Sequence, residues 1–189
     1  MRLRPLRAIT VPSPVLGHRA GRWYVGPLHV ADASSYIVAG DTLLAQPFYV
    51  PARRTYDRIA VNATAAESGK SVRLGIYRHD YANVVPGALA LDAGAVSVAV
   101  EGKREIVISQ ALSAGWWWLA LLSDATGAAR LAASGTVGGN AMLGYDDADT
   151  TAFHRYVTRS QAYGALPDPF GAVSSYVVSV VTPRVWLRA

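Results

Sequence analysis

Between residues 41 and 122 the chain alternates short runs of apolar and polar residues, and Gly, Pro, Asn or Asp interrupts them about every ten residues. Such a pattern is typical of antiparallel strands that bury one face in a core and expose the other to water. It predicts an all-β fold, an antiparallel β-sandwich of eight or more strands, with a jelly-roll connection favoured. Strands are expected at 35–38, 42–50, 56–65, 71–80, 95–100, 103–109, 115–124 and 128–134.

The two ends of the chain depart from this rhythm. Residues 1–30 contain several prolines and no acidic residue, and they predict an extended N-terminal arm with a strand at 22–30. Residues 31–189 are expected to form the sandwich, interrupted by an irregular excursion at 135–172 and closed by one or two strands within 174–188. Pro47 and Pro183 predict sheet edges or bulges, because proline removes a ladder donor. The Pro86-Gly87 dipeptide predicts that 81–94 is a loop.

The charge of the chain is concentrated in this arm. The net charge of the whole chain is +5, and the arm alone supplies it, so the remainder is neutral. An arm with scattered arginines and no aromatic platform favours anchoring to another protein over binding nucleic acid. The predicted anchor residues are Arg2, Arg4, Arg7, Arg19 and Arg22.

Composition narrows the possible partners. Half of the chain is hydrophobic (51%) and only 16% is charged, which favours a homo-oligomer that buries apolar surface between copies. No apolar run is long enough to span a bilayer. The prolines near the N-terminus interrupt any signal-like stretch, so we expect a protein that is made in the cytoplasm and kept there unless a larger assembly carries it out. The absence of cysteine excludes disulfides and thiolate metal sites.

Few residues suggest chemistry. Scattered histidines lack metal-ligand spacing, no G-x-S-x-G elbow occurs, and Gly69-Lys70-Ser71 lacks the first glycine of a phosphate loop. Asp146, Asp147 and Asp149 are interpreted as solvated loop residues rather than a calcium site. The sequence therefore predicts no catalytic residue, no metal and no cofactor, and hence no enzyme.

Aromatic residues are the remaining candidates for binding. Alternation places Trp116 and Trp118 on one face of a strand and Trp117 on the other, and at least two of the three are expected in the core. Tyr77 and Tyr81 lie at a strand end and in the loop after it, where a rigid scaffold commonly presents binding residues. The alternative is an ordinary turn in which Asp80 and Asn83 hydrogen-bond backbone amides.

Five segments between residues 43 and 123 resemble a β-sandwich module found in minor structural proteins of tailed bacteriophages. They read A-Q-P-F-Y-V-P (45–51), T-Y-D-R-I (55–59), R-L-G-I-Y (73–77), P-G-A-L-x-L-D-A-G (86–94) and A-G-W-W-W-L-A (114–120). The resemblance implies a non-enzymatic virion component, assembled in the host cytoplasm with other virion proteins, often as a trimer at the particle periphery.

Two functions are compatible with this resemblance. The first is a tail-fibre or baseplate component that touches a host-surface glycan, with predicted contacts Trp117, Tyr77, Tyr81, Tyr145 and Tyr163. The second is a capsid decoration or head-fibre protein that clamps coat subunits through the arm and the excursion and binds no sugar. A secreted carbohydrate-binding module is disfavoured because the chain has neither a signal peptide nor a catalytic partner domain.

Overall fold

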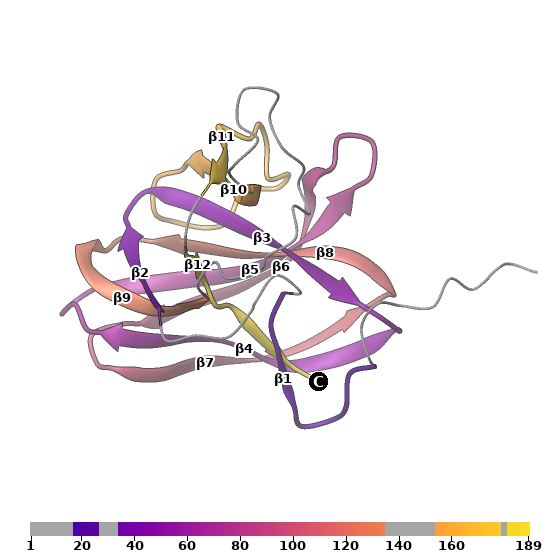
Figure 1. Cartoon of the computed structure of the whole chain (residues 1–189), viewed down its shortest axis with the longest axis horizontal. Coiled ribbons are helices and arrows are strands. Elements are labelled where there is room, and N and C mark those ends of the chain that lie inside the picture. The colour runs from indigo at the N-terminus through magenta and orange to yellow at the C-terminus, as the bar shows by residue number, and fades with distance from the viewer. Residues whose placement is uncertain (1–16, 27–33, 135–153, 179–180) are drawn as a thin grey trace, which may run out of the picture.

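The computed structural model describes residues 17–26, 34–134, 154–178 and 181–189, and within them it is a sandwich of two antiparallel sheets without a helix (Figure 1). The β-sandwich prediction is thereby confirmed. The seven-stranded sheet contains β1 (Trp23–Tyr24), β2 (Ser34–Ala39), β4 (Arg54–Ala65), β7 (Gly102–Leu112), β9 (Thr126–Ser134), β12 (Thr182–Pro183) and β13 (Trp186–Arg188). The six-stranded sheet contains β3 (Thr42–Val50), β5 (Ser71–Asp80), β6 (Val85–Ser97), β8 (Gly115–Ser123), β10 (His154–Ser160) and β11 (Ser175–Val178).

The strands change sheets at almost every connection. From β2 to β9 the chain passes between the two sheets at each step except the β5–β6 hairpin. Within these eight strands the pairings run β2-β9-β4-β7 in one sheet and β3-β8-β5-β6 in the other. Strands β6 and β7 therefore pair on one side only within the described residues.

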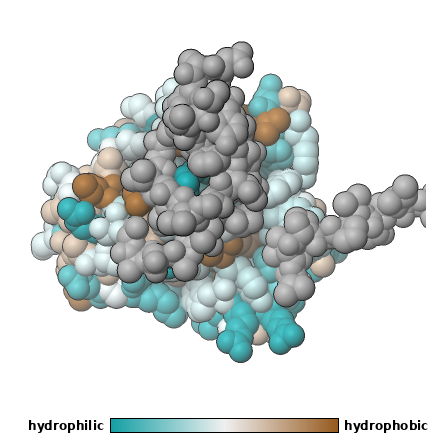
Figure 2. Space-filling view, viewed as in Figure 1, coloured by the Kyte–Doolittle hydropathy of each residue, from teal (hydrophilic) through white to brown (hydrophobic). Residues whose placement is uncertain are grey.

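The main core lies between the two sheets. Alternation turns Ile59 and Val61 of β4 toward Leu74 and Ile76 of β5, and all four are fully buried. Trp117 joins this core from β8. On the face of the molecule that Figure 2 shows, the visible hydrophobic patches of the described surface are small and separated by polar residues.

A second hydrophobic cluster covers the outer face of the six-stranded sheet. Trp118 and Tyr77 point away from the main core and pack against Val157, Leu166 and Phe170, which come from the 154–173 region. The predicted excursion therefore contains a strand, β10, and a segment that buries apolar side chains. Residues 135–153 of the excursion lie outside the described residues. At least two of the three consecutive tryptophans are buried, as predicted.

Three predictions that rest on proline have different outcomes. The loop expected at 81–94 is wrong, because β6 begins at Val85 and pairs Pro86 with His79. An edge strand tolerates the missing N–H of Pro86, so the dipeptide did not end the strand. Pro183 lies in β12, which ends the path of its sheet, as predicted. Pro47 lies in β3, but outside residues 42–45, which pair with β10. At Pro47 the strand therefore pairs only with β8 among the described residues, and it has a local edge there.

The described part of the predicted arm, residues 17–26, lies against the sandwich. Of the strand predicted at 22–30, β1 covers Trp23–Tyr24 and pairs with β13. His18 is buried, stacks on Tyr24 with ring centroids 3.8 Å apart, and its Nδ1 lies 2.6 Å from the Tyr56 hydroxyl. The side chains of Arg19 and Arg22 are exposed, whereas Arg2, Arg4 and Arg7 lie outside the described residues.

Candidate functional site

The candidate site lies at the end of the sandwich where β5 turns into β6. The Asp80 carboxylate holds this turn, accepting hydrogen bonds from the Ala82 amide (2.9 Å) and the Asn83 side-chain amide (2.7 Å). Those two hydrogen bonds, the one from Asn83 foremost, lower the pKa of Asp80, so the carboxylate is charged at neutral pH. The predicted turn chemistry is therefore present at Asp80, and it fixes the residues on either side.

The turn contains a residue in an unfavourable backbone conformation. Val84 has a φ of 58°, which is rare for a β-branched side chain, and 52% of its side chain is exposed. Its amide donates to the Asp80 carbonyl at 2.8 Å. The hydrogen bonds to Asp80 thus hold Val84 in a backbone conformation that a valine does not favour.

An aromatic column connects this turn to the protein interior. Tyr81 is 68% exposed and meets the His79 ring edge-on at 4.5 Å. His79 in turn stacks on buried Trp118 at 5.9 Å, and its Nδ1 accepts a hydrogen bond of 2.9 Å from the Trp118 indole. That bond leaves the proton of neutral His79 on Nε2, and burial lowers the pKa of this histidine. Tyr81 is therefore a surface aromatic ring that packs on His79, which in turn packs on the buried Trp118.

The neighbouring aromatic residues extend the same surface. Tyr49 and Trp116 face each other across β3 and β8, with ring centroids 5.0 Å apart. The Trp116 amide donates to the Tyr81 hydroxyl at 3.4 Å. Tyr81 thus leans over the start of β8, close to Gly115, where an added Cβ would lie 2.9 Å from its hydroxyl.

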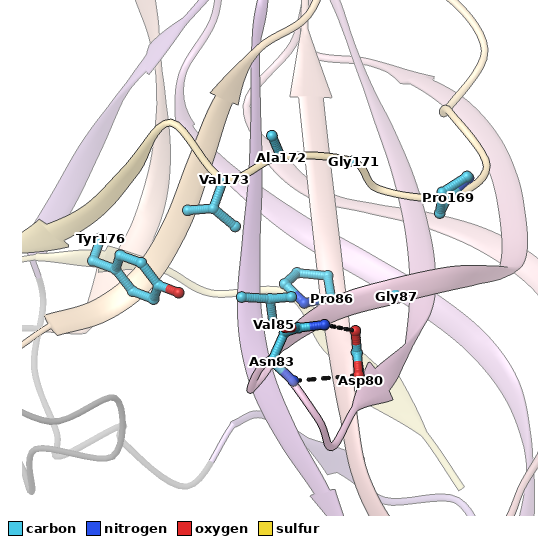
Figure 3. A pocket seen from close by; sticks show the side chains of 10 residues that line it. All are labelled: Asp80, Asn83, Val85, Pro86, Gly87, Pro169, Gly171, Ala172, Val173 and Tyr176. Atoms are coloured by element: carbon cyan, nitrogen blue, oxygen red, sulfur yellow. Dashed lines mark hydrogen bonds between the residues drawn. The ribbon is translucent and has the colours of Figure 1, made fainter.

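A pocket of about 530 Å³ opens on the other side of the turn (Figure 3). Tyr176 of β11 points across it toward Val85 and Pro86, and Asp80 and Asn83 lie at its lower side in this view. Its lining comes from two segments far apart in sequence, Asp80, Asn83, Val85, Pro86 and Gly87 from the hairpin and Pro169, Gly171, Ala172, Val173 and Tyr176 from the C-terminal part.

The C-terminal wall of the pocket is fixed by hydrogen bonds to the sheet. The Phe170 amide donates to the Gly87 carbonyl at 3.0 Å, and the Asp168 carboxylate accepts from the Leu89 amide at 2.9 Å. The Tyr77 hydroxyl donates to the Pro167 carbonyl at 2.9 Å. The pocket is therefore held open between two anchored segments, which is the preorganisation that a binding site requires.

The chemistry of this end suits recognition of a hydroxylated ligand. Asp80 supplies a charged acceptor and Asn83 an amide, while the 42%-exposed Tyr176 adds a ring and a phenol. Exposed rings such as those of Tyr81 and Tyr176 offer apolar faces with a polar edge. Among the described residues, no three His, Cys, Asp or Glu side chains gather in a metal-binding group.

The structure separates the five predicted contact residues. Tyr81 lies on the surface at this end. Tyr77 is fully buried and Trp117 is 5% exposed, so their rings are not part of the surface. Tyr163 is half-buried against the outer cluster, and Tyr145 lies outside the described residues.

Two residues of the site were not among the predicted contacts. His79 was considered only as part of the aromatic and polar group at 77–81, although it lies against Trp118 on the strand face of Tyr77. Tyr176 gave no local signal, because only the pairing of β10 with β11 and with β3 brings it near the β5–β6 turn.

Comparison with known proteins adds no further information. No protein-family model matches the sequence, and no curated protein matches it. Within the described ranges, no helix is long and apolar enough to cross a membrane.

Proposed function

We propose that this chain is a non-enzymatic component of a tailed-phage virion, a peripheral tail-fibre or baseplate sandwich that contacts a host-surface glycan. The observation that carries the proposal is Tyr81, a highly exposed ring that His79 and Trp118 support from below. Exposed aromatic rings held by a rigid scaffold are suited to stacking on the apolar face of a pyranose. The adjoining pocket supplies the Asp80 and Asn83 side chains for hydroxyl groups.

We also infer that the sandwich is a jelly roll. In that fold the first, eighth, third and sixth strands form one sheet, and the second, seventh, fourth and fifth form the other. The pairings β2-β9-β4-β7 and β3-β8-β5-β6 follow this order when β2 is taken as the first strand. Jelly rolls occur in viral capsid proteins and in lectins. Because one fold serves many functions, this supports the virion proposal only by analogy.

Decoration of a capsid is the second candidate, and two observations favour it. Val100 and Val107 are 64% and 70% exposed in the single chain, so both side chains are accessible to another protein. Strands β6 and β7 are long and pair on one side only within the described residues. Such edges and apolar side chains suit contact with a coat subunit or with further copies of this chain, as in the trimer expected from the resemblance.

The test of glycan contact compares the full chain with its Tyr81→Ala variant in co-sedimentation with bacterial host cells and with purified envelope polysaccharide. Loss of one stacked ring is expected to weaken binding several-fold, up to about tenfold. Val100→Ala is the matched control, because it also shortens an exposed side chain but lies away from the turn. Unchanged binding by Tyr81→Ala, or no binding by the folded wild type, would move the assignment to capsid decoration.

A further inference from the structure

The solvent face of the seven-stranded sheet carries a second, smaller pocket of about 250 Å³. Four strands contribute to it, with Trp23 from β1, Asn62 from β4, Lys103 from β7 and Trp186 from β13. Alternation explains their direction, because Val61 and Leu187, the chain neighbours of Asn62 and Trp186, are buried in the main core. The pocket therefore lies on the opposite side of the sheet from the core.

A small residue of β4 lies beside this pocket. Ala60 lies in the middle of β4, opposite Trp186 on one side and Glu105 on the other. It points away from the main core and is nevertheless fully buried, so larger side chains of the neighbouring strands cover it.

Charged side chains flank the Trp23 indole. The Lys103 ammonium lies 4.8 Å from the Trp23 ring centroid and 2.8 Å from the Glu105 carboxylate. Arg188 lies 6.0 Å from the same ring and makes two hydrogen bonds, of 2.8 and 2.6 Å, to Asp57. Arg58 bridges both acids, and these five side chains together carry three positive and two negative charges, a net of +1.

We propose that this pocket binds a pyranose ring that carries a carboxylate, as a uronic acid does. Trp186 is the ring on which the sugar stacks, because Lys103 and Arg188 already flank Trp23. The Asn62 amide can donate to one hydroxyl and accept from another. Lys103 has three N–H donors and makes one ion pair, so it can also meet the sugar carboxylate, and the excess positive charge favours this.

The proposal is independent of the site at the β5–β6 turn, because it shares no residue with that site. The size of the pocket, below that of a drug-sized cavity, suits a single sugar ring. For so small a ligand we expect a dissociation constant of about 1 mM. The two sites can therefore be tested separately on the same protein.

The test is an NMR titration of the full chain with methyl glucuronide, beside methyl glucoside as the neutral probe of the same shape. The proposal predicts shifts of the Trp186 indole and Asn62 amide signals, with the glucuronide binding at least fivefold more tightly. Lys103→Gln should remove that preference and Asn62→Ala should weaken both sugars, whereas Lys70→Gln, the other lysine of the chain, should change neither. At position 186 the variant to use is Trp186→Phe, because it keeps an aromatic ring, whereas Trp186→Ala risks unfolding β13.

Three results would overturn the proposal. One is the absence of any shift at Trp186 or Asn62 with either sugar at about 20 mM, well above the expected dissociation constant. Another is equal affinity for the two sugars, which would remove the carboxylate from the proposal. The third is a loss of binding in Lys70→Gln equal to that in Lys103→Gln, which would reduce the effect to net charge. A dispersed amide spectrum in each variant establishes that it is folded.

Discussion

Gln46 is a polar residue at the centre of the sandwich. Gln46 is 2% exposed, and neither its amide nitrogen nor its side-chain carbonyl oxygen has a hydrogen-bond partner among the described residues. It lies in β3 opposite Leu119, between strand positions that are apolar. A buried polar group without a partner costs about 1–3 kcal/mol, so Gln46 weakens the fold.

Replacing Gln46 by methionine is therefore expected to stabilise the protein. Methionine keeps the length and flexibility of the side chain while removing the two unpaired polar atoms. We expect the free energy of unfolding to rise by about 1 kcal/mol or more, measured by urea denaturation. Gln110→Met, at a more exposed position of β7, is the control and should have little effect. A destabilised Gln46→Met variant would mean that Gln46 binds something that the fold needs.

His18 fastens residues 17–26 to the sandwich and makes that contact sensitive to pH. Burial first, and the nearby Arg54 second, lower the pKa of His18, so it is neutral in the folded protein. Tyr24, Phe48 and Tyr56 surround its ring and provide no negative charge. The unfolded chain takes up a proton near pH 6.5 that the folded chain resists. The contribution of His18 to stability is thus complete above pH 6.5 and is lost as the pH falls below it.

The corresponding measurement is hydrogen exchange of residues 17–26 at pH 8 and pH 5, corrected for the intrinsic exchange rates. Protection of these amides should fall at the lower pH in the wild type. In His18→Gln the difference between the two pH values should shrink, while His79, whose pKa is also lowered, still titrates in both proteins. Equal pH dependence in both proteins would show that His18 is not the group responsible.

At the scale of elements, the sequence was most informative about strands that turn residues delimit. The strands predicted at 42–50 and 71–80 have the bounds of β3 and β5, because alternation and turn residues agree there. The start of β6 was missed, since Pro86-Gly87 is a strong local turn signal and its tolerance at an edge depends on sheet order.

The site was predicted in part for a related reason. Tyr81 follows the end of β5 and was expected at the surface, where the structure has it. Tyr77 was predicted to contact a glycan, which requires an exposed ring, but Leu166 and Phe170 cover its face of the strand. The residues that cover this face come about 90 positions later in the chain, so the alternation of apolar and polar residues within β5 does not indicate them. Alternation thus identifies the two faces of a strand without telling which one water reaches.

Gly75 tests how this second layer is attached. A Cβ at this position would lie 2.1 Å from the Leu166 Cδ1 and 2.8 Å from the Leu91 carbonyl oxygen. Gly75→Ala is therefore expected to push Leu166 off the sheet and to destabilise the protein by about 1–3 kcal/mol. Exchange of the Leu166 amide, which donates to Asp92 at 3.0 Å, should speed up before that of the sheet amides.

The control for this variant is Gly164→Ala, in the same segment, where the added Cβ would have no atom of a described residue within 4 Å. It should leave both stability and exchange near the wild-type values. If Gly75→Ala were as stable as Gly164→Ala, the outer layer would be loosely held, and the pocket beside it would lose its fixed wall.

At the scale of the whole molecule, the distribution of charge supports a division of labour. The first 30 residues carry the net charge of +5, and the rest of the chain is neutral. The exposed side chains of Arg19 and Arg22 lie next to residues that dock on the sandwich through His18. We propose that the basic segment grips other virion proteins while the β5–β6 turn faces outward. This arrangement requires that the protein be a fixed part of a particle.

Immunogold electron microscopy of phage particles from a lysate that contains this protein tests that requirement most directly. An antibody against the folded chain, absorbed with Tyr81→Ala protein in a parallel sample to show specificity, should label intact particles at the tail. Label on the head instead would favour capsid decoration. Particles free of label, with the protein confined to the soluble fraction of the lysate, would contradict the account of this chain as a virion component.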